Sequence, residues 1–181
     1  DKEPSAAMAK LLAQKYLGKD DYVKAEQFYR EMIKMAGGEG SEDGTSEEDP
    51  AMQAEGYMAI AGIKAKQNKY NDARSLFLKA AATDANQASK AYTSIGDLYV
   101  RTARSCLPPA EKTDPVANQA PYLAAYDMYA KAGNNAKMSS ARGAFPSKTD
   151  IFTWQAKRGY VEGQSITVYG WIGGSAILRA R

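Results

Sequence analysis

The chain has 181 residues, of which 44% are hydrophobic and 25% charged, the composition of a folded globular protein, and no apolar run approaches the ~20 residues of a membrane-spanning helix. Within these residues, the lack of histidine and the single cysteine, Cys106, exclude a Ser-His-Asp or Cys-His catalytic site, an intramolecular disulfide and a cysteine metal cluster. The net charge of +3 is unevenly placed, because residues 37–49 hold six acidic and no basic side chains. The rest of the chain is therefore basic, which is compatible with an acidic partner or with ordinary surface charge.

Seven helices are predicted from the periodicity of apolar residues and from capping signals such as Asp49-Pro50 and Gly37-Gly38. In chain order they span about residues 5–17, 21–35, 50–67, 70–83, 86–105, 121–132 and 136–142. Two segments interrupt them: the acidic residues 37–49, which are too polar to fold alone, and the insertion 107–119, which begins where Pro108-Pro109 breaks a helix. The sequence does not indicate a role for either segment.

The last part of the chain has a different pattern. Residues 145–152 predict a turn-rich linker, residues 165–172 alternate as a strand does, and Gly173-Gly174 predicts a hairpin turn before a return strand over 175–180. Because a lone hairpin is marginally stable in water, we expect it to pack against the helices. The apolar side of its first strand would face inward: Ile166, Val168 and Ile172.

A short pattern with helical spacing occurs three times: Tyr, then Ala three residues later, then an aromatic residue four after the Ala. Residues four apart lie one above the other on a helix, and a small Ala beside a large aromatic lets a neighbouring helix approach closely. An aliphatic residue precedes the Ala by 13 residues in the first two copies and by 30 in the third. The copies are Tyr22-Ala25-Tyr29, Tyr70-Ala73-Phe77 and Tyr122-Ala125-Tyr129, with the aliphatic residues Leu12, Ile60 and Ile95.

These patterns resemble the tetratricopeptide repeat (TPR), in which two antiparallel helices form a unit that stacks on its neighbours to bury its apolar face. We therefore expect a mainly α fold, a TPR-like right-handed superhelix of about three helical hairpins with a capping helix, followed by a small β-hairpin. The units would span about residues 5–36, 50–84 and 86–133, with the cap at 134–144. Residues 1–144 would form the repeat domain, and residues 145–181 a linker and hairpin packed on it.

Three segments resemble a group of exported bacterial TPR proteins that mostly lack an assigned function. They are residues 124–132, 145–152 and 168–172, and Cys106 before the insertion also fits the group. The resemblance covers about residues 50–181, and it implies export to the periplasm or cell envelope and binding to a protein, but no chemistry. The leader would be absent from this chain, which starts at Asp1 without Met, and a cytoplasmic location stays open.

The first helix of each TPR unit lines the concave surface of the stack, and we expect a peptide or protein segment of a partner to bind in that groove. The registered units place these residues there: Lys10 and Gln14, then Met58 and Lys66, then Thr93, Asp97 and Arg101. Some TPR domains hold a peptide's terminal carboxylate with Lys, Asn and Arg, but Asp97 would repel a carboxylate, so we do not expect that mode. Ordinary solvated surface is the alternative for these residues.

We expect no catalysis, cofactor or metal site, because the acidic residues form no recognisable pair and residues 37–49 do not match a calcium-loop spacing. An alternative function is a carbohydrate-binding accessory protein of the cell envelope that uses the aromatic residues Trp154, Tyr169 and Trp171. A carboxylate-based hydrolase is a third. We expect no nucleic acid partner, because the sequence has no dense stripe of Lys and Arg with interleaved aromatics, and a weak homodimer stays open.

Overall fold

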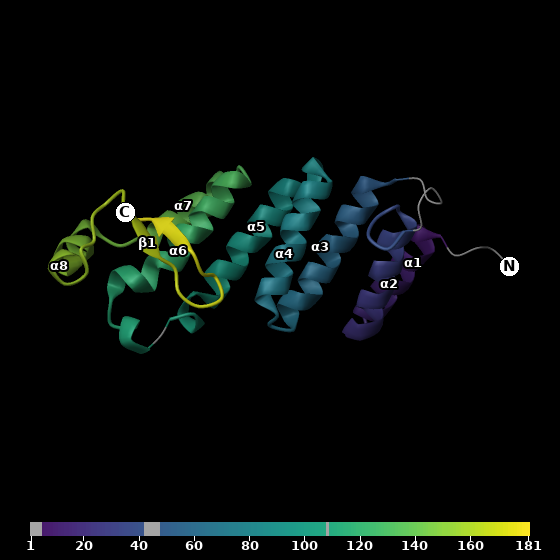
Figure 1. Cartoon of the computed structure of the whole chain (residues 1–181), viewed down its shortest axis with the longest axis horizontal. Coiled ribbons are helices and arrows are strands. Elements are labelled where there is room, and N and C mark those ends of the chain that lie inside the picture. The colour runs from purple at the N-terminus through teal and green to yellow at the C-terminus, as the bar shows by residue number, and fades with distance from the viewer. Residues whose placement is uncertain (1–4, 42–47, 108) are drawn as a thin grey trace. The chain divides into compact units, whose positions relative to one another are not determined.

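The structure is a computed structural model, which describes residues 5–41, 48–107 and 109–181 (Figure 1). The chain forms two compact units, Asp1–Ala91 and Tyr92–Arg181, and each is described by itself. Residues 42–47 of the acidic segment and Pro108 of the insertion lie outside the described residues. Among the described helices, none combines the length and the apolarity that a membrane crossing requires.

The first unit consists of helical pairs (Figure 1). α1 (Ala6–Leu17) pairs with α2 (Tyr22–Met35), α3 (Pro50–Lys66) pairs with α4 (Tyr70–Thr83), and α2 also packs against α3. Ser5, Asp21 and Asp49 cap the first three of these helices, because each side chain accepts a hydrogen bond from a backbone N–H of the first turn. These caps explain why α1, α2 and α3 begin within one residue of their predicted starts, and α4 begins at its predicted residue without a side-chain cap.

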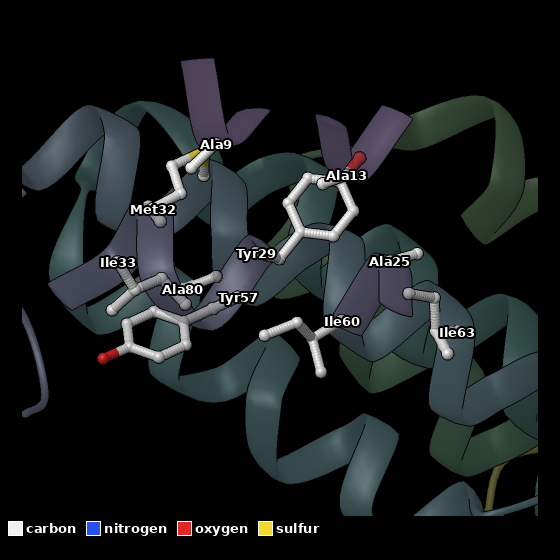
Figure 2. Close-up of a cluster of buried hydrophobic side chains, with 11 residues drawn as sticks. Ala9, Ala13, Ala25, Tyr29, Met32, Ile33, Tyr57, Ile60, Ile63 and Ala80 are labelled. Atoms are coloured by element: carbon white, nitrogen blue, oxygen red, sulfur yellow. The ribbon is translucent and has the colours of Figure 1, made fainter. Parts of the chain in front are cut away.

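The core of the first unit contains the small and large residues of the repeated pattern. Ala25 and Tyr29 are buried on α2 (Figure 2), and Ala73 and Phe77 are buried on α4. Two helices approach closely at Gly56, where an added Cβ atom would lie 2.5 Å from Ile33 Cγ1. The pattern of Ala and aromatic residues therefore marks the interfaces between helices.

The second unit contains most of α5 and all the elements that follow it. They are α5 (Ala85–Thr102), the short 3₁₀ turns η1 (Ala103–Ser105) and η2 (Pro109–Glu111), α6 (Pro115–Lys131), α7 (Asn135–Gly143), α8 (Lys148–Arg158), β1 (Ser165–Thr167) and β2 (Ser175–Ile177). The two strands are antiparallel, with Ile166 opposite Ala176. The predicted class, mainly helical with a C-terminal β-hairpin, is confirmed.

Helix α6 begins at Pro115, whereas the sequence analysis placed its start at Pro121. The reason is the cap at Asp114, whose buried carboxylate accepts hydrogen bonds from the backbone N–H groups of Val116 (2.9 Å) and Ala117 (3.1 Å). Pro121 lies inside the helix, where it removes one backbone N–H donor. It does not end the helix, because the cap at Asp114 and the buried residues of the first turns stabilise it. Residues 115–119, the end of the predicted insertion, are therefore helix.

The C-terminal segment also departs from its prediction. Residues 145–152 contain the first turn of α8, because Ser147 and Asp150 form a reciprocal capping box. The residues between the strands, 168–174, form a loop instead of a two-residue turn. Gly170 allows the loop to pass close to Cys106, since its φ is +71° and an added Cβ atom would lie 2.6 Å from Cys106 Cβ.

The C-terminal segment packs on α6, which contacts α8 and both strands. Its buried apolar residues are Phe145, Ile151, Ile166, Val168, Ile172 and Leu178. The indole N–H of Trp171 donates a hydrogen bond to Thr102 Oγ1 at 2.9 Å, and its ring meets that of Tyr99 edge-on at 5.4 Å between centroids. The face that alternation predicted to be apolar is thus the buried one.

A polar cluster joins the insertion to the C-terminal segment. The fully buried carboxylate of Asp114 accepts a hydrogen bond from the Tyr160 hydroxyl at 2.8 Å, and Arg158 donates to Glu111 Oε2 at 2.8 Å. Burial, followed by the hydrogen bond to Asp114, raises the pKa of Tyr160, so its hydroxyl remains a donor. The insertion therefore has a structural role, which is to hold α8 and the hairpin in place.

Candidate functional site

In the first unit, the predicted surface residues lie on α1 and α3. Lys10 Nζ lies 2.6 Å from Glu55 Oε2, and this ion pair joins the two helices. Lys66 Nζ lies 5.4 Å from the centre of the Tyr22 ring on α2. Gln14 is exposed, whereas Met58 packs against the core. The charge of Lys10 is therefore balanced within the chain by a residue that the sequence analysis did not single out.

In the second unit, the predicted surface residues Thr93, Asp97 and Arg101 lie four apart on α5. Asp97 forms two hydrogen bonds with side chains of later helices. Asp97 Oδ1 accepts hydrogen bonds from Lys137 Nζ at 2.6 Å and from the Tyr129 hydroxyl at 2.8 Å. Burial, followed by the hydrogen bond to Asp97, raises the pKa of Tyr129, so this hydroxyl stays protonated. Lys137 thus balances the charge of Asp97, which was expected to repel a carboxylate.

A cleft opens beside this ion pair, between α5, α6 and α7, and we call it the α5–α7 cleft. Its volume is about 620 Å³, which lies within the usual range of ligand-binding pockets. Besides Asp97 and Lys137, its walls include Val100, Arg101, Tyr122, Ser140, Ala141 and Ala144. Two of the predicted groove residues, Asp97 and Arg101, therefore line one cleft together with residues of two later helices.

A second cleft adjoins the first, because the two share Tyr122 and Ala144. We call it the insertion cleft, since most of its walls come from η1, the insertion and the start of α6, and its volume is about 580 Å³. Its other lining residues are Arg104, Leu107, Lys112, Asn118 and Gln119. Asn118 Nδ2 donates a hydrogen bond to the Lys112 carbonyl at 2.7 Å and so holds this wall against α6.

The sequence analysis missed what α6 and α7 contribute to these clefts. Tyr122 was recognised only as a pattern residue, and Lys137 only as part of a capping helix. No local signal connects Lys137 with Asp97, which lies 40 residues earlier in the chain. Their pairing depends on where α7 packs against α6, which is a property of the tertiary structure.

The three aromatic residues considered as carbohydrate anchors have different surroundings. Trp171 is half-buried and hydrogen-bonded to Thr102. Lys157 Nζ lies 5.0 Å from the centre of the Trp154 ring. Tyr169 lines a separate cleft of about 350 Å³ beside β1. Each therefore makes its own local contacts, and carbohydrate binding stays a prediction.

No protein-family model matches the chain, and no curated protein sequence matches it. Among solved structures, the chain is similar to one described as the TPR2B-domain:pHsp70-complex of yeast Sti1, with 22% sequence identity and a TM-score of 0.46. The alignment covers 84% of this chain and 98% of that chain. The repeated pattern and the helical hairpins that carry it are those of a TPR-like protein.

Proposed function

We propose that this chain is a non-catalytic scaffold that binds a peptide or protein segment of a partner in the α5–α7 cleft. The observation that carries the proposal is the make-up of this cleft. Val100, Ala141 and Ala144 offer apolar contact for side chains, while Tyr122 and Ser140 offer hydrogen bonds to a backbone. A mostly apolar cleft with a few polar groups is typical of a binding site.

The charges of the cleft support binding rather than catalysis. Asp97, the carboxylate that lines it, accepts hydrogen bonds from Lys137 and Tyr129 and is therefore a poor general base. The sequence contains no histidine, the side chain most often used for proton transfer at neutral pH. The partner is proposed only as a class, a protein segment, because the chemistry of the walls does not specify more.

A photo-crosslinking amino acid at position 140 tests this proposal. Ser140 lines the α5–α7 cleft, whereas the neighbouring Ser139 is also exposed but does not line it, so the two positions form a matched pair. In extract of the source cell, we expect irradiation to give a covalent protein adduct at position 140 and not at 139. Adding Arg101→Glu should reduce the adduct at 140. Equal adducts at both positions, or none at 140, would contradict the proposal.

A further inference from the structure

The insertion cleft carries positive charge that the proposed function does not use. Arg104 and Lys112 line it, both side chains are exposed, and neither forms an ion pair with a residue that the structure describes. Its described lining contains no acidic residue. In the neighbouring cleft, by contrast, Lys137 is paired with Asp97. Lys137, one of the two basic residues of the α5–α7 cleft, is therefore paired with a carboxylate of the same cleft, whereas neither basic residue of the insertion cleft is paired with a described residue.

A buried amide oxygen without a hydrogen-bond donor from the described residues lies in the same cleft. Gln119 Oε1 is buried and accepts no hydrogen bond from the described part of the chain. A buried amide oxygen without a donor destabilises the fold, so turning this amide toward a ligand N–H would be favourable. The terminal torsion of a glutamine side chain is soft enough to allow that rotation. Leu107, which is buried beside it, gives the cleft an apolar wall.

We infer that the insertion cleft binds an acidic side chain of an extended protein segment. Arg104 and Lys112 bind the carboxylate, and Gln119 Oε1 accepts a hydrogen bond from a backbone N–H of the same segment. The inference rests on the proposed function, because the shared residues Tyr122 and Ala144 make the insertion cleft a continuation of the α5–α7 cleft. The first cleft then takes the segment, and the second selects segments that carry Asp or Glu.

Fluorescence anisotropy with two labelled peptides tests this inference on the full chain. One probe is a peptide of alternating Glu and Ser, and the other replaces each Glu by Gln. The test variant is Arg104→Glu/Lys112→Glu, and the control variant is Lys34→Glu/Lys148→Glu. The control makes the same change in net charge at two exposed residues that do not line the cleft. Gln119→Met is a third variant, which keeps the side-chain length and removes the amide.

We expect the Glu peptide to bind the unaltered chain and the control variant, with an affinity that falls as salt is added. The test variant should bind it at least about tenfold more weakly, since two attractive charges become repulsive. Gln119→Met should bind severalfold more weakly while its melting temperature stays level or rises. This variant keeps the test decisive if the double variant does not fold.

Two results would overturn the inference: equal binding of the Glu and Gln peptides, including no binding of either, or a folded test variant that binds like the control. The crosslinking experiment separates this failure from failure of the proposed function. An adduct at position 140 without Glu-peptide binding removes only the acidic preference. Glu-peptide binding that depends on Arg104 and Lys112, without an adduct at 140, removes only the α5–α7 cleft.

Discussion

Gly96 is the position where one methyl group tests how α5 packs on α6. An added Cβ atom would lie 2.5, 2.8 and 2.9 Å from Cε1, Cδ1 and Cζ of Tyr129. Carbon atoms in favourable contact are about 3.5–4.0 Å apart. The Tyr129 ring cannot move away freely, because it is buried and its hydroxyl is hydrogen-bonded to Asp97. Gly96→Ala must therefore displace the ring or separate the two helices.

Two opposing effects set the size of this perturbation. Alanine is favoured over glycine inside a helix by up to about 1 kcal/mol. Overpacking a close interface costs about 1–3 kcal/mol. We expect Gly96→Ala to lower the free energy of unfolding by up to about 2 kcal/mol, and the melting temperature by up to about 8 °C. Urea unfolding followed by circular dichroism measures the first quantity, and thermal scans measure the second.

Two other glycines provide matched controls. An added Cβ atom at Gly62 of α3 or Gly143 of α7 meets no heavy atom within 4 Å. Gly62→Ala should raise the free energy of unfolding by about 0.5–1 kcal/mol, because only the helix propensity changes. Gly143→Ala, at the end of its helix in the same unit as Gly96, should be nearly neutral. If Gly96→Ala is as stable as these controls, α5 and α6 do not approach as closely as described, and the packing argument is refuted.

Three further predictions concern other parts of the chain. Asp114→Asn weakens a fully buried helix cap that also accepts a hydrogen bond from the Tyr160 hydroxyl, so urea unfolding should show a free energy of unfolding lower by about 2–4 kcal/mol. The control Asp127→Asn, at a partly exposed ion pair, should lower it by about 1 kcal/mol or less. Equal losses would contradict the role of burial. Burial raises the pKa of Glu26, but hydrogen bonds from Lys64 and Arg30 outweigh the effect of burial and hold the pKa below its usual 4.5. The stability that Glu26 contributes is therefore present above that pH and lost as the pH falls through the lowered pKa; Glu26→Gln should reduce this acid loss in melting curves, and an unchanged pH profile would refute the linkage. Removal of residues 145–181 uncovers α6, so we expect a lower melting temperature and aggregation in light scattering, whereas an unchanged, monomeric chain would show that the segment is a detachable tail.

The helices of the first unit could be predicted from the sequence because their signals are local. Asp49 caps α3 at the residue where the sequence predicts a start, since a cap acts on the N–H groups of the adjacent turn. Ala25 and Tyr29 mark a buried helix face, because a period of four places them on one side. The inward face of the hairpin followed from strict alternation in the same way, with Ile166 and Val168 both buried.

The candidate site depended on distances that no local pattern encodes. The sequence could place residues of α5 on one surface. It could not show that Lys137, 40 residues after Asp97, balances the charge of Asp97, because that depends on where α7 packs. The start of α6 has the same local Asp-Pro signal as the start of α3. What no local pattern encodes is the second role of Asp114 as the buried partner of Tyr160, 46 residues away. Helical periodicity acts within one or two turns, whereas charge balance and cleft shape depend on separation in space. The sequence therefore determined the helices of the first unit, and the tertiary structure decided the clefts.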